Sequence, residues 1–353
     1  MNRYIGLELF RGTAAIMVMV CHYAFMLTEG ITLLTFMWTG VDLFFVISGF
    51  VFARFILSKN IEFAPFIIRR FFRIYPLYIA SLILYFLITA DHQNKIEYFV
   101  NHMFFLNTTN SREEFLYFNG AFWSLPVEVE FYLLVPLLCL LGRFKHTLII
   151  VFIVSLCSKA FIYMQMTAGK VDIYTILDVH ITGVMAEFII GVFAYKAVIY
   201  TDKHKQHQRF TLAIASAILG MVMLASLSLY FVKFGLIDNK FLATYFGVLC
   251  ATGYALLIFC VLMIKENEIP TPMIKSMLFL GSISYPVYLI HNSAINLNTL
   301  LELNLQGIQF FLAAVAYTVF VSILLHKIVE EPVRLYGRRL SKIKRPAVFN
   351  SYN

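Results

Sequence analysis

Ten apolar segments of about 20 residues each follow one another along this chain, and an α-helix of that length can cross a lipid bilayer. They lie near residues 9–28, 36–57, 68–90, 122–142, 147–166, 178–200, 210–231, 242–264, 276–298 and 307–329. Lipid offers backbone N–H and C=O groups no hydrogen-bond partner, so each segment has to be helical. The chain is therefore predicted to be an all-α integral membrane protein with about ten transmembrane helices in one bundle.

The composition excludes an ordinary soluble protein. Hydrophobic side chains make up 60% of the 353 residues and charged ones 14%, against about 45–50% and 25% in soluble domains. No long polar insertion interrupts the segments, so we expect one membrane domain over residues 1–340 and a basic, polar tail over 341–353. The first segment is too long for a cleavable signal and is expected to stay as the first span.

The distribution of positive charge predicts the orientation. With the N-terminus inside the cell, 22 Lys and Arg residues flank the cytoplasmic ends of the spans and five lie in the outer loops. Such a bias sets topology in membrane proteins, so both termini are predicted to be cytoplasmic. The net charge of +8 is then accounted for by the membrane topology and does not indicate nucleic-acid binding. The basic run 338–345 is expected to contact anionic lipid headgroups.

Two further features limit the chemistry. The five cysteines all fall inside apolar segments without metal-ligand spacing, so neither a disulfide framework nor a metal site is predicted. The one long outer loop, residues 91–121, contains an apolar stretch (98–107) that is too short to span and is expected to be re-entrant or interfacial. His92 and His102, in the same loop, are expected to be solvated.

Ionisable side chains inside spans are costly and usually face a bundle interior. Arg11 and His22 are 11 residues apart in the first span, which places them on one helix face and about 16 Å apart along the axis. Asp42, Glu128 and His291 fall at a depth similar to that of His22 in the second, fourth and ninth spans. These four groups are predicted to form one layer, although any one of them alone is equally well explained as a satisfied packing group.

A second cluster lies at the inner end of the third span. Arg69, Arg70 and Arg73 fall within two turns, so they are neighbours on a helix surface. Anchoring to the inner membrane surface is one explanation, and either Lys or Arg would serve that purpose. Planar, bidentate binding of a phosphorylated ligand requires Arg specifically.

Six motifs in order resemble a known family. They are "FRGTAAIMVMVCH", "GVDLFFVISGF", "RRFFRIYPLY", "WSLPVEVEFY", "SYPVYLIH" and "VEEPVRLYGRRL", and they cover nearly the whole chain. Together they resemble acyltransferase family 3, the membrane O-acyltransferases that modify bacterial surface polysaccharides. The resemblance implies transfer of an acyl group, usually acetyl, from cytoplasmic acyl-CoA to a hydroxyl of an extracytoplasmic glycan such as O-antigen, capsule or exopolysaccharide.

The resemblance also implies roles for matching residues. His22 is expected to be the catalytic base or the acyl carrier, with Asp42 or Glu128 orienting its imidazole and His291 in the same site. Arg11 and the arginines of the third span, Arg69, Arg70 and Arg73, are expected to bind the phosphates of acetyl-CoA. The acceptor is a carbohydrate, free or lipid-linked, and the protein is expected in the bacterial cytoplasmic membrane with no metal cofactor.

The motifs also depart from the family. Pro126 and Val127 stand where a Ser-Val pair is frequent, and Glu130 adds a second carboxylate close to Glu128. No hydrolase-like domain is expected after the last motif. A proton-coupled transporter is the alternative, because layers of His, Asp and Glu also form proton relays, but the chain shows no pair of broken segments in its two halves. An inactive scaffold is a third alternative, against which the full set of motif residues argues.

Overall fold

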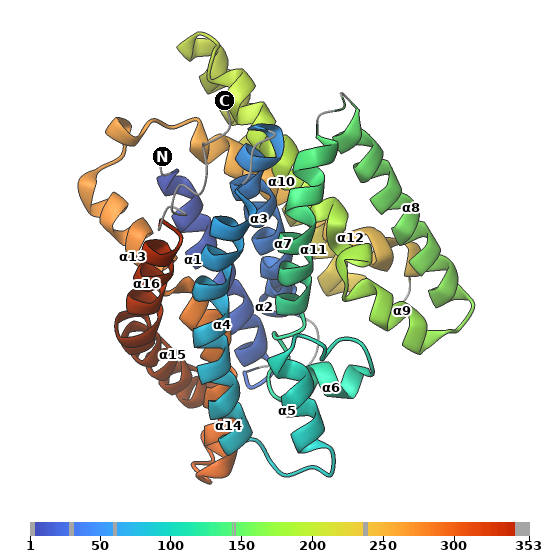
Figure 1. Cartoon of the computed structure of the whole chain (residues 1–353), viewed down its shortest axis with the longest axis vertical. Helices are drawn as coiled ribbons and strands as arrows, with labels where there is room; N and C mark the ends of the chain where they lie inside the picture. Colours follow the sequence, from blue (N-terminus) through green and yellow to red (C-terminus); the bar gives the residue numbers. More distant parts are fainter. Residues whose placement is uncertain are drawn as a thin grey trace, which may run out of the picture.

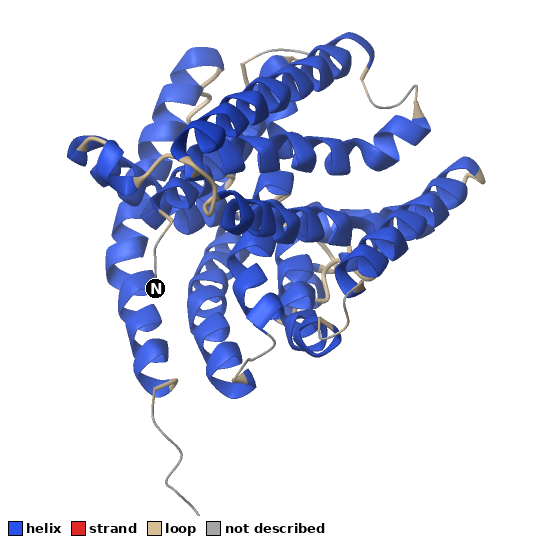
Figure 2. Cartoon of the chain, turned by 90° about the horizontal axis from the view of Figure 1, so that it is seen from above, coloured by secondary structure: helices blue, strands red, loops and turns tan. Residues whose placement is uncertain are grey.

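The computed structural model describes residues 4–27, 32–58, 62–142, 144, 146–235 and 239–342. Helices make up the framework, and no strand occurs within these ranges (Figure 2). The helices are α1 (Ile5–Ala24), α2 (Leu33–Phe36), α3 (Gly40–Ser58), α4 (Phe63–Ile88), α5 (Lys95–Met103), α6 (Arg112–Tyr117), α7 (Ser124–Leu141), α8 (Thr147–Thr167), α9 (Val171–Asp178), α10 (Ile181–Thr201), α11 (Gln206–Phe234), α12 (Lys240–Leu262), α13 (Thr271–Ile290), α14 (Ser293–Leu300), α15 (Gly307–Leu325) and α16 (Glu331–Leu340).

The predicted number of spans is confirmed for the part of the chain that the structure describes. Ten helical stretches are long and apolar enough to cross a membrane. In Figure 1 the start of α1 and the end of α16 lie toward the upper end of the bundle, and α5, α6 and α14 lie at the lower end. Of the predicted cytoplasmic charges, Arg3, Lys59, Arg143 and Lys145 lie outside the described residues, as does the predicted tail from residue 343 onward.

The centre of the bundle is a set of closely packed helices. Helix α1 packs against α13 and α3, and α3 packs against α10. Gly49 of α3 lies against the backbone of Phe188, and Gly191 of α10 lies against that of Val46, so that a side chain at either glycine would meet a carbonyl oxygen. This close approach joins α3 and α10 along a seam with no room for side chains.

The outer faces of the peripheral helices are apolar. Large hydrophobic side chains are exposed along α8 and α11, for example those of Ile149, Ile153, Leu219 and Val222. Exposed apolar surface of this extent is incompatible with water, and lipid would cover it in a membrane. The polar and charged side chains are thus concentrated inside the bundle or at its ends.

The last two predicted spans have different boundaries in the structure. The ninth was expected to continue to residue 298, but α13 ends at Ile290 and α14 begins at Ser293. The final carbonyl oxygens accept hydrogen bonds from side chains: that of Leu289 from Asn119, that of Ile290 from Ser293, and that of His291 from Tyr23. Side-chain donors satisfy these helix-end acceptors, and the break turns His291 and Asn292 into the bundle.

The tenth span continues beyond its predicted end. A π-helical turn, His326–Glu330, joins α15 to α16. Such turns are uncommon and often occur at functional sites. Here it brings the His326 ring nitrogen Nδ1 within 2.8 Å of a Glu330 carboxylate oxygen, one turn further along the chain.

The long outer loop enters the bundle. After α5 the chain carries the Phe105 ring onto that of Tyr78, with centroids 4.8 Å apart, and to 6.0 Å from the centroid of Tyr75. Tyr75 is near the middle of α4, so the segment after α5 is re-entrant. His102 was expected to be solvated, which is wrong: it is fully buried, because its helix packs on α4 and the Tyr78 hydroxyl donates to its carbonyl.

Candidate active site

His22 and His291 meet between α1 and the end of α13. The Nδ1 atom of His22 lies 3.2 Å from Nε2 of His291, and the ring centroids are 4.8 Å apart. His22 is two residues from the end of α1, and His291 caps the C-terminus of α13. Two of the four groups predicted to form one layer are therefore in direct contact.

A neutral amide orients His22. The Oδ1 atom of Asn292 lies 2.7 Å from Nδ1 of His22. Asn292 Nδ2 in turn donates to Oδ1 of Asn119 at 2.7 Å. The expectation that Asp42 or Glu128 would orient the imidazole is not met, since Asn292 occupies that position.

The backbone fixes the orientation of both amides. Asn119 Oδ1 accepts from the backbone N–H of Ala121 at 2.9 Å, and its Nδ2 donates to the carbonyl of Leu289 at 2.9 Å. The amide of Asn119 can therefore offer only an acceptor to Asn292. Asn292 must then donate with Nδ2 and present Oδ1 to His22.

This chain of hydrogen bonds determines the tautomer of His22. Because Asn292 offers an oxygen, Nδ1 of His22 carries the proton and donates it. His291 supports the same arrangement, because its own Nδ1–H faces the carbonyl of Tyr288 at 2.9 Å and leaves Nε2 as an acceptor toward His22. The Nε2 atom of His22 keeps its lone pair and makes no hydrogen bond to the described residues.

The structure places Asp42 elsewhere. Asp42 is the third residue of α3 and is buried. Its charged neighbours are Glu187, Lys159 and Asp178. Asp42 thus belongs to a separate group of charges, and the predicted four-member layer divides because α3 presents this face to α10 and α12.

Glu128 belongs with the arginines. It accepts hydrogen bonds from Tyr132, one turn further along α7, and from Ser48 of α3 at 3.4 Å. Its carboxylate interacts electrostatically with the guanidinium groups of both Arg11 and Arg70. Glu130 points to another face of α7, where it bonds His180 and the backbone N–H of Ile181, the first residue of α10.

Two of the predicted arginines, Arg70 and Arg73, lie in one cluster with Arg11. The positive charge of Arg73 is close enough to interact electrostatically with those of Arg11 and Arg70. The guanidinium carbon of Arg70 lies 4.9 Å from the ring centroid of Phe52 and 5.7 Å from that of Tyr132. Arg70 is thereby held by stacking as well as by charge. Arg69 makes no ion pair within the described ranges.

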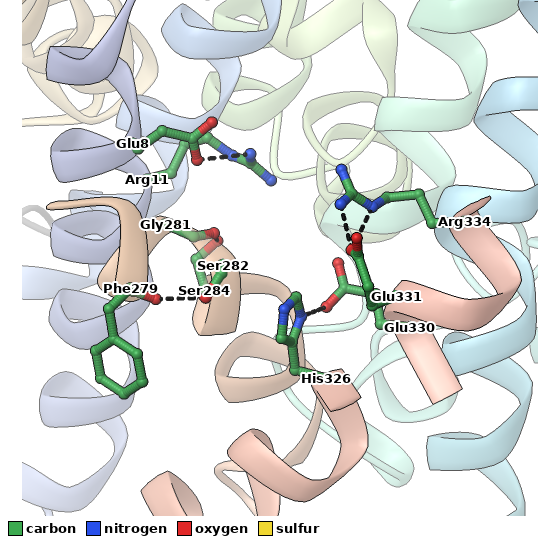
Figure 3. A network of polar contacts seen from close by, with 10 residues as sticks. All are labelled: Glu8, Arg11, Phe279, Gly281, Ser282, Ser284, His326, Glu330, Glu331 and Arg334. Carbon is green, nitrogen blue, oxygen red and sulfur yellow. Dashed lines mark hydrogen bonds and ion pairs between the residues drawn. The ribbon is translucent and has the colours of Figure 1, made fainter. Parts of the chain in front are cut away.

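Carboxylates complete this cluster. Arg11 pairs with Glu8 of α1 at 3.3 Å, and the charge of Glu330 also acts on Arg11. Figure 3 shows Arg11 of α1 opposite the pair formed by Arg334 and Glu331 of α16, with Glu330 and His326 between the two helices. Nε of Arg70 is buried and has no hydrogen-bond partner. An unpartnered guanidinium N–H in a basic cluster suits an anionic ligand such as a phosphate.

Sequence reasoning missed three polar residues of the site. They are Asn119, Asn292 and Tyr85, whose hydroxyl accepts from Asn119 at 3.1 Å. Only Asn292 carried a signal, because it directly follows His291 at the end of a span. Asn119 lies in the outer loop, and nothing in its local sequence indicates that it reaches the histidines.

Comparison with known proteins identifies the family of this chain. The family profile described as an acyltransferase domain matches residues 4–327. The chain belongs to acyltransferase family 3. It is therefore an acyltransferase, and its ten apolar helices are typical of a membrane protein.

Curated relatives bear acetyltransferase names. The chain is 26% identical over 258 residues to a putative acetyltransferase of Acidianus two-tailed virus, covering 72% of each chain. It is also 26% identical over 372 aligned positions to the O-acetyltransferase OatA of Staphylococcus aureus, covering 95% of this chain. The match spans 58% of the OatA chain. No solved structure matches this chain.

Proposed function

We propose that this acyltransferase moves an acetyl group from acetyl-CoA to a hydroxyl group of an extracytoplasmic carbohydrate, with His22 at the reaction centre. The observation that carries the proposal is the fixed tautomer of His22, which leaves the lone pair of Nε2 available. The relatives named O-acetyltransferase support an oxygen acceptor. The resemblance of the motifs supports a surface glycan as its source.

In the direct mechanism His22 acts as the general base. Nε2 takes the proton from the sugar hydroxyl, the hydroxyl oxygen attacks the thioester carbonyl, and the C–S bond breaks. The thiolate of CoA then receives the proton from the imidazolium. While His22 is charged, its Nδ1–H still faces two acceptors, Asn292 Oδ1 at 2.7 Å and His291 Nε2 at 3.2 Å, which stabilise the positive charge.

The same atom serves the alternative mechanism. In a relay, Nε2 of His22 attacks the thioester itself and carries the acetyl group until the hydroxyl displaces it. Both routes need Nε2 to be unprotonated at the start. Trapping an acetylated enzyme after mixing with radiolabelled acetyl-CoA in the absence of acceptor would distinguish the relay from direct transfer.

The arginine cluster is the proposed binding site for the donor. Arg11, Arg70 and Arg73 would contact the phosphates of CoA, and the unpartnered Nε of Arg70 supports an anionic ligand there. Arg11 and His22 belong to one unbroken helix and are about 16 Å apart along its axis. The pantetheine arm would extend along this helix from the arginines to the histidines.

The test is substitution of His22. His22→Ala should abolish acetylation of the surface glycan, measured by mass spectrometry of cell-surface carbohydrate from a deletion strain carrying each variant. The protein should insert at normal abundance, because His22 is partly exposed and lies two residues from the end of α1. His204→Ala, at a loop histidine, is the control. Acetylation retained in His22→Ala would reject the proposal.

A further inference from the structure

A second group of charges is buried in the bundle, apart from the histidines and the arginines. Asp42 of α3, Lys159 of α8 and Glu187 of α10 are 5%, 4% and 1% exposed. The Nζ atom of Lys159 lies 3.3 Å from a carboxylate oxygen of Glu187. It also lies 3.9 Å from Asp178 at the end of α9, whose side chain is half exposed.

The two buried carboxylates converge on one point. Oδ1 of Asp42 and Oε1 of Glu187 are each 2.9 Å from the position that a Cβ atom of Gly247 would take. The two oxygens are therefore separated by no more than twice that distance. Only glycine leaves room for both at this point on α12.

The carboxylates are incompletely bonded. Oδ2 of Asp42 and both oxygens of Glu187 are buried and have no hydrogen-bond partner of good geometry. Cys250 and Tyr254 of α12 are the other titratable groups near Asp42. Neither carries a positive charge, so Lys159 is the one buried cation that acts on the pair within the described chain.

The charges do not balance if both carboxylates are ionised. Lys159 neutralises one of them, while moving a second carboxylate from water into a dry interior costs several kcal/mol even after relaxation. Two carboxylates this close in a buried site disfavour ionising together, so one of them keeps its proton.

We propose that Asp42 and Glu187 form a proton-binding site inside the membrane domain, which exchanges its proton with water through Lys159 and the half-exposed Asp178. The transfer is from a hydronium ion to a carboxylate, giving water and a carboxylic acid. This site does not depend on the proposed acetyl transfer. It also supplies a role for Lys159, which the sequence motifs leave unexplained.

The position of the pair gives the proton a structural consequence. Asp42 and Glu187 belong to the two helices that meet at the glycine seam of Gly49 and Gly191. Losing the proton would place two like charges across this seam, which cannot widen without loss of packing. Because Ser48 of α3 also bonds Glu128, strain at the seam would reach the arginine cluster.

Infrared difference spectroscopy of the purified protein in detergent tests the site directly. At neutral pH the exposed carboxylates are ionised and give no C=O band of a protonated carboxylic acid. Such a band, identified by its shift in deuterated water, therefore comes from a buried acid. We expect this band in the wild-type protein. It should disappear in Asp42→Asn and in Glu187→Gln, since either variant leaves a single buried carboxylate beside Lys159, and that carboxylate can ionise.

Two controls and a second readout make the result decisive. Asp91→Asn, at a fully exposed side chain, and Asp178→Asn should keep the band.

The melting temperature of the wild-type protein should fall as rising pH removes the proton, and the two site variants should lack this dependence. A wild-type protein without the band would overturn the proposal, as would a band that persists in either site variant. If the band is absent and the melting temperature rises when sodium ion is added, the site binds sodium and the proposal is also overturned.

Discussion

At the scale of single residues, the site relies on neutral amides where carboxylates were expected. Asn292 holds the Nδ1–H of His22, and Asn119 holds Asn292 in the orientation that allows this. An amide orients an imidazole without adding a negative charge to a poorly solvated site, where an uncompensated charge would be costly. The tautomer of His22 is therefore set by geometry and by backbone groups rather than by an ion pair.

Replacing Asn292 tests this arrangement. Asn292→Ala removes the nearer of the two acceptors for Nδ1–H, so the imidazole can rotate or take the other tautomer. We expect kcat to fall by about tenfold to hundredfold, part of the roughly 10²–10⁴-fold that a positioned general base contributes. Asn296→Ala, one turn along α14 and bonded to Thr89 instead, is the matched control. Equal rates in the two variants would show that Asn292 does not position His22.

The arginines allow a similar comparison between neighbours. Arg73→Gln removes a charge beside Arg11 and Arg70, and we expect KM for acetyl-CoA to rise about tenfold, the effect of losing one charged hydrogen bond. Arg69→Gln, one turn earlier on α4, should change KM little. Initial rates at varied acetyl-CoA concentration, with purified protein in lipid, measure both. If the two variants behave alike, the cluster serves membrane anchoring.

At the scale of elements, the breaks in the helices bring the site together. The end of α13 at Ile290 turns His291 and Asn292 toward His22, and the re-entrant segment after α5 brings Phe105 onto Tyr78 of α4. Both depend on partners distant in sequence, which explains why hydropathy could place the spans but not these breaks. A hydropathy window measures how apolar a segment is and does not report which side chains bond its last carbonyl groups.

The burial of α5 predicts acid sensitivity. Burial lowers the pKa of His102 from its usual 6.5 to about 4, so the unfolded chain binds a proton between these values that the folded chain does not. The contribution of neutral His102 to the free energy of unfolding is therefore fully present above pH 6.5. It is lost as the pH falls toward 4, and the loss is on the order of 3 kcal/mol.

Melting temperatures measured across this range would check the effect of His102. His102→Gln should reduce the loss between pH 6.5 and pH 4, because the amide does not titrate. His207→Gln, at an exposed position, should melt like the wild-type protein at each pH. An unchanged pH dependence in His102→Gln would contradict the assigned burial effect.

At the scale of the whole molecule, the arrangement separates donor and acceptor chemistry. The arginines and the histidine pair lie at different depths along α1, at Arg11 and His22 respectively. We propose that the arginine end faces the cytoplasm, where acetyl-CoA is made, as the distribution of Lys and Arg predicts. The end that carries α5, α6 and α14 would then face outward.

Accessibility labelling tests this orientation. In a cysteine-free background, a cysteine replacing exposed Arg112 of α6 should react with a membrane-impermeant maleimide added to intact cells. A cysteine replacing exposed Lys205, at the start of α11, should react only after the membrane is opened. Labelling in the reverse pattern would place the arginine cluster outside and reject cytoplasmic acetyl-CoA as its ligand.

The sequence by itself determined the class of the protein, the ten spans, the family and the residues His22, His291, Arg11, Arg70 and Arg73 as candidates. These follow from hydropathy and from short motifs, which are properties of neighbouring residues. Only the tertiary structure decided that Asp42 joins Lys159 and Glu187, that Glu128 lies with the arginines, and that two asparagines orient His22. The rotation of each helix about its axis decides which side chains meet, and that rotation is set by packing between segments far apart in the chain.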